Sequence, residues 1–270
     1  MPPTLYLGVD VGSTTTEALL LSAAGRLVRR TIRPTGSRPG ETAEAVIEEL
    51  LGAEKAAYTV STGYGRQLVG SAHRALTEIT CLALGAREQN STAAAVLDIG
   101  GQDSKFLWLT ADGRPASFAL NDRCAAGTGR FLELTAERIE LPLKSWGTID
   151  AAEAAGLSLS ATCGVFAESE LIGHLAAGVS PRRLAAAAAF SVAERVLPLM
   201  GQAGRAELSL DGGLALAGGV ASNPLVAQTL SLTFARRRLV AKPLEYPSFT
   251  VALGAALAAR HLGLRSDTTS

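Results

Sequence analysis

Residues 10–26 read DVGSTTTEALLLSAAGR, and they align without a gap with residues 98–114, DIGGQDSKFLWLTADGR. Seven positions are identical between the two copies, which begin 88 residues apart. In each copy an apolar stretch leads into an Asp-x-Gly turn, a second apolar stretch follows, and a glycine-containing turn leads to a third. Apolar runs separated by such turns predict strands joined as β-hairpins. The repeat therefore predicts two copies of one unit that begins with three strands.

Helical patterns follow each set of hairpins. Residues 42–51 place apolar side chains on one face and glutamates on the other. We therefore expect a duplicated β-β-β-α-β-α unit, in an α/β fold whose two lobes face each other across a cleft where the two Asp-x-Gly turns meet. The clearest polar break is at residues 88–92, so we expect a first lobe at 1–90 and a second at 91–248. A helical pattern at 249–262 is expected to complete the first lobe.

The composition limits the class of protein. The 270 residues are 47% hydrophobic, enough for a sizeable core, and 25 basic residues balance 25 acidic ones. A net charge of zero gives no reason to expect a nucleic acid or an anionic membrane as partner. Three cysteines are too few for a secreted disulfide framework, and no signal peptide or long apolar run is seen. We expect a cytoplasmic protein.

A third glycine turn follows the two repeated ones. Residues 216–223, LAGGVASN, come after an apolar stretch and before a helical pattern at 224–234. Glycines let a ligand approach the backbone, and backbone N–H groups with hydroxyls bind phosphate. Three such turns after strands predict a nucleotide site, with phosphates at the first two turns and the nucleoside at the third. The expected contact residues are Gly12, Ser13, Thr14, Thr15, Gly100, Gly101, Gly218, Gly219 and Asn223.

Carboxylates and one amide in these turns carry the expected chemistry. Asp10, Asp98 and Asp103 offer oxygen ligands for Mg²⁺, directly or through water. Gln102 can position an attacking water, so Asp10, Gln102 and Asp103 are the candidate catalytic residues, with Asp10 and Asp98 as magnesium ligands. The turns match neither a Walker A loop nor a Rossmann fingerprint. A single glycine turn is equally well explained as a hairpin, so the prediction depends on the repeated pattern.

Two cysteines precede stretches of helical character. Cys124 in NDRCAAGTGRF and Cys163 in SATCGVFAESE lie 39 residues apart, too far for a local chelate. The positive end of a helix dipole favours the thiolate that a metal centre needs. Zinc and iron–sulfur sites usually take four ligands, so two cysteines from each chain of a two-fold dimer would complete one shared cluster. The alternative is that both are buried core residues, as lone cysteines usually are.

Several segments together resemble one protein family. The order of the three turns is similar to the phosphate-1, phosphate-2 and adenosine motifs of the actin/hexokinase/Hsp70 superfamily, with its duplicated ribonuclease-H-type lobes. Within it, about residues 5–259 resemble the BadF/BadG/BcrA/BcrD group, the ATP-dependent activators of 2-hydroxyacyl-CoA dehydratases. The segments that carry this resemblance are VDVGSTTTE, STGYGR, TEITC, LDIGGQDSK, NDRCAAGTGRFLE, ATCGVFAESE, AGGVASN and ALGAALAA.

The resemblance implies a homodimer with one 4Fe–4S cluster between the subunits, bound by Cys124 and Cys163 of both chains. ATP or ADP would bind with Mg²⁺, and Gly127 and Gly129 would add to the nucleotide-binding residues. ATP hydrolysis would be coupled to one-electron transfer to a dehydratase, or a related CoA-ester reductase, that carries Fe–S clusters. Ferredoxin or flavodoxin would supply the electron.

Two other functions are open at this stage. A small-molecule kinase of the same superfamily, such as an N-acetylglucosamine kinase, would use the same ATP cleft but leave the two cysteines unexplained. A nucleotide-dependent regulatory protein would bind a partner without transferring an electron. The GGQD form of the second turn favours a dehydratase partner by analogy. TEITC is commonly followed by His in the family and here by Leu82, and Cys81 is expected to be a buried core residue.

Overall fold

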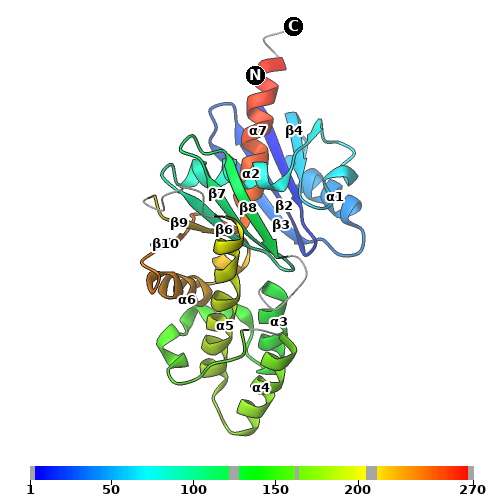
Figure 1. Cartoon of the computed structure of the whole chain (residues 1–270). Helices are drawn as coiled ribbons and strands as arrows, with labels where there is room; N and C mark the ends of the chain where they lie inside the picture. The colour runs from blue at the N-terminus through cyan, green and yellow to red at the C-terminus, as the bar shows by residue number, and fades with distance from the viewer. Residues whose placement is uncertain (1–3, 122–127, 162–163, 205–211, 267–270) are drawn as a thin grey trace. The chain divides into compact units, whose positions relative to one another are not determined.

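The computed structural model describes residues 4–121, 128–161, 164–204 and 212–266 (Figure 1). It contains two compact units, which are described separately. Unit 1 comprises residues up to Ser91, Ala111–Pro115 and residues from Ser248 onward. Unit 2 comprises Thr92–Thr110 and Ala116–Pro247.

Unit 1 is built on a five-stranded sheet with the order β3-β2-β1-β4-β5. The first three strands form the two predicted antiparallel hairpins, and β1 also pairs in parallel with β4. The parallel pairing requires a crossover, which α1 supplies. The elements of unit 1 are β1 (Leu5–Val11), β2 (Thr15–Ser22), β3 (Leu27–Pro34), α1 (Pro39–Leu51), β4 (Ala56–Thr62), β5 (Arg74–Ala75), α2 (Glu78–Gln89) and α7 (Thr250–Ser266).

Helices cover both faces of this sheet. Val46, Ile47 and Leu50 of α1 pack on the odd-numbered apolar residues of β1, because side chains alternate between the faces of a strand. On the opposite face, α7 packs on β1 and β2 and also crosses α2. The approach of α7 is close, since a Cβ atom built on Gly8 would lie 2.2 Å from the carbonyl oxygen of Ala252.

Unit 2 repeats the same sheet, with the order β8-β7-β6-β9-β10. β6 pairs antiparallel with β7 and parallel with β9, as β1 does with β2 and β4. The two sheets therefore match strand for strand. The elements of unit 2 are β6 (Ala95–Ile99), β7 (Ser104–Leu109), β8 (Pro115–Asn121), α3 (Gly129–Arg138), α4 (Gly164–Ala176), α5 (Pro181–Gln202), β9 (Leu214–Ala217), α6 (Pro224–Ala235) and β10 (Ala241–Pro243).

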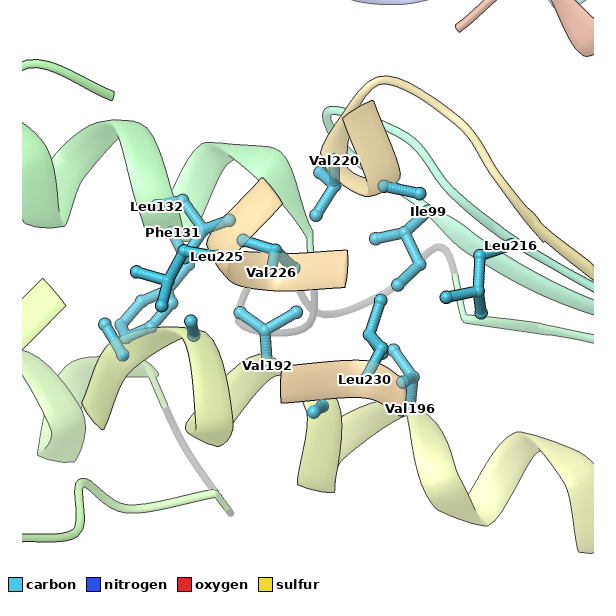
Figure 2. Close-up of a cluster of buried hydrophobic side chains, with 14 of the residues drawn as sticks. Ile99, Phe131, Leu132, Val192, Val196, Leu216, Val220, Leu225, Val226 and Leu230 are labelled. Carbon is cyan, nitrogen blue, oxygen red and sulfur yellow. The ribbon is translucent and has the colours of Figure 1, made fainter. Parts of the chain in front are cut away.

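A helical layer covers one face of the second sheet. Figure 2 shows Val192 and Val196 of α5 lying against Leu225, Val226 and Leu230 of α6. Local sequence sets where these helices begin, because Ser180 caps α5 and Pro181 occupies its first turn. Among the described helices, α5 is long and apolar enough to span a membrane by length and composition, but 61% of the tested window is buried, as in a core helix.

The repeated strands and the helices at 42–51, 224–234 and 249–262 are confirmed, with different limits. α1 begins earlier, at Pro39, and α7 continues to Ser266. The β-β-β-α-β-α pattern is incomplete, because each sheet has a fifth strand, β5 or β10, too short to show alternation. In unit 2, residues 139–213 separate α3 from β9, whereas residues 52–55 separate α1 from β4.

Candidate nucleotide-binding site

The two Asp-x-Gly turns have the same hydrogen bond at equivalent positions. In unit 1 the Gly12 amide donates to the carbonyl of Thr15 at 3.0 Å, and in unit 2 the Gly100 amide donates to the carbonyl of Asp103 at 2.9 Å. Both pairs are related by the repeat of 88 residues. The duplication therefore includes the conformation of the turn as well as the strands around it.

The end of β3 braces the first turn. The Thr35 hydroxyl donates to the carbonyl of Gly12 at 2.8 Å, and the Thr35 amide donates to the carbonyl of Thr14 at 2.9 Å. Ser13 is exposed, and Gly12, Thr14 and Thr15 are half-buried. The predicted residues of this turn thus present hydroxyls at the surface of unit 1, and hydrogen bonds from Thr35 fix the conformation of the loop.

Each turn aspartate faces a glycine at the end of the neighbouring parallel strand. A Cβ atom on Gly63 would lie 2.4 Å from Oδ1 of Asp10, and one on Gly218 would lie 2.4 Å from Oδ1 of Asp98. Both glycines have positive φ, 84° and 87°. Gly218, expected to contact the nucleoside, is thus the counterpart of Gly63, and both leave room for an aspartate carboxylate.

Lys105, which sequence reasoning does not single out, lies in β7, two residues after Asp103 of the second turn. Lys105 is 5% exposed, and its Nζ atom lies 2.7 Å from Oδ2 of Asp103. Lys105 is also the cross-strand partner of Asp98, so the two side chains share a face. A lysine ammonium is a common ligand of phosphate oxygens, so Lys105 is a candidate phosphate-binding residue. The signal was present in the sequence, since Lys105 follows the turn by two residues.

The equivalent position in the first turn carries the opposite charge. Glu17 stands where Lys105 stands in the second copy, is 6% exposed, and is the cross-strand partner of Asp10. Unit 1 therefore gathers two carboxylates at its turn, as a cation site needs, whereas unit 2 adds an ammonium. Among the residues that the structure describes, no three His, Cys, Asp or Glu side chains form a metal-binding group.

In the third turn, the side chain of Asn223 makes hydrogen bonds within the protein, whereas Gly219 is exposed. Asn223 caps α6, with its Oδ1 accepting from the Leu225 amide at 3.1 Å and its Nδ2 donating to the carbonyl of Leu143 at 3.1 Å. Gly219 is exposed, and a Cβ atom there would meet no heavy atom within 4 Å. Gly219 is the predicted residue of this turn whose missing side chain is not explained by packing. Gln102 is likewise exposed, in the second turn.

Helix α3 is joined directly to the second turn. The amides of Gly129 and Arg130 donate to the carbonyls of Gly100 and Gly101, both at 2.9 Å. α3 begins five residues after Cys124 in the sequence, and α4 begins immediately after Cys163. Arg138 of α3 and Glu168 of α4 form an ion pair at 3.0 Å. The candidate ligands Cys124 and Cys163, with Gly127, lie outside the described residues.

Cys81 is a buried core residue, as expected. Its exposed fraction is 0%, and Leu82 beside it is also fully buried. Burial raises the pKa of the Cys81 thiol to about 12, and the carboxylates of Asp10 and Glu78 add to the rise. Such a thiol stays protonated at neutral pH and is a poor metal ligand.

Two matching units, each with an Asp-x-Gly turn packed on a glycine, define a two-lobed ATPase of the actin/hexokinase class. A ROK family glucokinase from Streptomyces griseus, crystallised with glucose and AMPPNP, shares this fold with a TM-score of 0.58, 14% identity and coverage of 95% of this chain and 99% of its own. More specifically, the chain belongs to the BadF/BadG/BcrA/BcrD ATPase family, whose pattern matches residues 7–259.

Two relatives are similar over most of the chain. The activator of lactoyl-CoA dehydratase from Anaerotignum propionicum is 37% identical over 255 residues, which are 93% of this chain and 95% of the relative. The solved structure of the activator of the 2-hydroxyisocaproyl-CoA dehydratase from Clostridium difficile, with bound ADPNP, superposes with a TM-score of 0.86. It is 31% identical and covers 99% of this chain and 98% of its own.

Proposed function

We propose that this protein is an ATP-dependent activator of a 2-hydroxyacyl-CoA dehydratase. In this proposal a homodimer holds one 4Fe–4S cluster and couples ATP hydrolysis to the transfer of one electron to the dehydratase. One observation carries the proposal: the chain is 37% identical to a dehydratase activator along 93% of its length. Nearly complete coverage of both chains means that no domain of that relative lacks a counterpart here.

The residues of the two turns fit a nucleotide with Mg²⁺. Asp10 and Glu17 of unit 1 would orient the cation through their oxygens, since Mg²⁺ is usually held by one or two carboxylates and water. Lys105 and the Gly100–Gly101 backbone of unit 2 would hold phosphate oxygens. Bound Mg²⁺ neutralises charge that develops on the phosphates. Gln102, exposed in the turn, would position the attacking water.

The donor set fits an iron–sulfur cluster shared by two chains. Cys124 and Cys163 supply two thiolates per chain, and the helices that follow them, α3 and α4, are joined by the Arg138–Glu168 ion pair. Val165, Phe166 and Ile172 of α4 are apolar and 69%, 65% and 51% exposed. A second copy of the chain would cover such a surface. The cluster supplies one-electron redox chemistry at low potential.

Hydrogen bonds between the second turn and α3 would transmit a change at the nucleotide to the cysteine segments. The carbonyls of Gly100 and Gly101 accept the first amides of α3, so a shift of this turn moves the start of α3 with it. We propose that ATP and ADP place this turn differently, and that the change reaches the cluster through α3 and changes its exposure or potential. Ferredoxin or flavodoxin would then reload the electron.

The test is anaerobic purification followed by iron and sulfide analysis. The parent dimer is expected to hold four irons, and Cys124→Ser or Cys163→Ser to lose them while still binding ATP. Cys81→Ala is the matched control, because a buried, protonated thiol contributes no ligand, and it should retain all four irons. Four irons in a Cys124→Ser dimer would refute the ligand assignment.

Activation of the partner is tested separately. With a reductant and ATP, the parent should activate a 2-hydroxyacyl-CoA dehydratase, and Asp10→Ala should keep its cluster but lose most ATP hydrolysis. A colourless protein that phosphorylates a sugar would instead identify a kinase. An iron-containing protein that activates a benzoyl-CoA reductase and no dehydratase would change the partner. A cluster without ATP-stimulated reduction of any acceptor would indicate a regulatory protein.

A further inference from the structure

Arg195, in the middle of α5, contacts two segments that are far apart in the sequence. Its guanidinium carbon lies 4.4 Å from the centroid of the Phe131 ring in α3. Its Nη2 atom also donates a hydrogen bond to the carbonyl of Ser160. One side chain of α5 therefore binds α3 by stacking and the chain before α4 by a hydrogen bond.

The backbone of Ser160 is held from two sides. Its carbonyl accepts a second hydrogen bond, from the Ser191 hydroxyl of α5 at 2.9 Å. Its amide donates to Oε2 of Glu170 in α4 at 2.6 Å. The residue is thus fixed between α4 and α5, and Arg195 is the member of this set that also reaches α3.

These contacts lie close in sequence to both candidate ligands. Ser160 precedes Cys163 by three residues, and Phe131 follows Cys124 by seven. We propose that Arg195 is a positioning residue that holds α3 to the chain before α4, and that iron binding by Cys124 and Cys163 requires this arrangement. This inference rests on the proposed function, because it assigns Arg195 a purpose only if Cys124 and Cys163 are ligands.

Arginine is suited to this task in a way that lysine is not. A planar guanidinium stacks on an aromatic ring with its face and donates hydrogen bonds from its edge at the same time. A lysine ammonium is a compact charge on a flexible stem and fixes neither direction. Arg195→Lys is therefore expected to behave like a loss of function at this position, although the charge is kept.

Arg183 provides a matched control on the same helix. It also donates to backbone carbonyls, to Glu153 at 3.3 Å and to Ala155 at 2.9 Å, and among the described residues it has no recorded contact with α3 or with residues 156–161. Arg195→Met and Arg183→Met remove the same groups from α5. A difference in iron affinity or hydrogen exchange between these variants is therefore caused by the contacts specific to Arg195 and not by the loss of any arginine from α5.

The experiment compares these variants as anaerobic dimers. For Arg195→Met and Arg195→Lys, iron affinity measured by competition with a chelator should fall about 10- to 100-fold, as for other residues that orient metal ligands. Arg183→Met should match the parent. In metal-free protein, hydrogen exchange of the 156–161 backbone should be faster in Arg195→Met than in Arg183→Met. ADP affinity should be equal in all four proteins, which shows that they are folded.

Each result decides the inference. Weaker iron binding together with faster exchange, confined to the Arg195 variants, supports it. Equal iron affinity in Arg195→Met and Arg183→Met, or equal exchange in the metal-free proteins, overturns it while leaving the proposed function intact. A parent dimer without iron overturns the proposed function, and the inference falls with it.

Discussion

At the scale of residues, the two copies of the unit differ in the charge of the residue that pairs across the strands with each turn aspartate. Asp10 and Glu17 form a cross-strand pair in unit 1, and Asp98 and Lys105 form the equivalent pair in unit 2. The turn hydrogen bond and the glycine that contacts each aspartate are repeated around both pairs, although the turn residues at 13–15 and 101–103 differ. Glu17 and Lys105 carry opposite charges at equivalent positions, and we propose that this reversal assigns a cation to the first turn and phosphate to the second.

Lys105→Met is expected to lower the free energy of unfolding by about 3 kcal/mol, because Asp103 would remain buried without its ion-pair partner. The double variant Asp103→Leu/Lys105→Met should recover much of this loss. Urea unfolding of the two variants and the parent measures both effects. Equal stability of the single and double variants would contradict the loss assigned to a buried, unpaired Asp103.

Cys81 predicts a specific loss of stability at alkaline pH. An unfolded cysteine ionises near pH 8.5, whereas the folded pKa is about 12. Between these values the unfolded state binds fewer protons, so the free energy of unfolding falls as pH rises, by up to about 1.4 kcal/mol per pH unit. Cys81→Ala should show a smaller decline between pH 9 and 10.5. Parallel curves for parent and variant would contradict the assignment.

At this scale the sequence predicted the glycine turns but not which side chains pair across neighbouring strands. The repeat identified Asp10, Asp98 and their turns, because identical residues at a constant offset require no knowledge of the fold. It did not single out Lys105 or Glu17, which became visible only when the strand register placed them opposite the aspartates. Asn223 was expected at the nucleotide, but its side chain caps α6.

At the scale of elements, the crossing of α2 and α7 depends on glycine. A Cβ atom on Gly85 would lie 1.8 Å from the carbonyl oxygen of Thr250, and one on Gly254 would lie 1.8 Å from that of Cys81. The two helices therefore approach through their backbones. Real Cβ atoms cannot occupy these positions unless the helices separate.

Gly85→Ala is expected to destabilise unit 1 by about 1–3 kcal/mol, because overpacking outweighs the gain of roughly 1 kcal/mol in helix propensity. Gly201→Ala in α5 is the control, since a Cβ atom there meets no heavy atom within 4 Å, and it should be neutral or slightly stabilising. Thermal unfolding of both variants shows whether each substitution lowers or raises the stability. A stabilised Gly85→Ala variant would mean that the helices are farther apart.

The elements show why periodicity found some strands and not others. β1, β2, β6 and β7 are apolar over most of their length and buried, so their presence could be predicted. β5 has two residues and β10 has three, which is less than one full alternation of a strand. They pair in parallel with β4 and β9, which are separated from them in the sequence, and a local pattern contains no information about such partners.

At the scale of the whole molecule, the proposed dimer gives a prediction that does not depend on catalysis. Phe166→Asp on α4 replaces a 65% exposed aromatic side chain by a charge in the surface assigned to the second copy. This variant should shift sedimentation from dimer to monomer and lose iron, since each monomer has only two candidate cysteines. Leu68→Asp is the control, because Leu68 is 55% exposed in unit 1. A dimeric, iron-loaded Phe166→Asp protein would place the interface elsewhere.

The unequal connections in the two units suggest an order of events in the ancestry of the chain. Both units trace the same sheet, yet the short link of residues 52–55 has as its counterpart the long segment 139–213, which contains α4, α5 and Cys163. An ancestor with two short links would have possessed both aspartate turns but only one of the two thiols. Under the proposed function, nucleotide binding would then be the older property, and the proposed electron transfer would have been added later, together with the longer connection of unit 2.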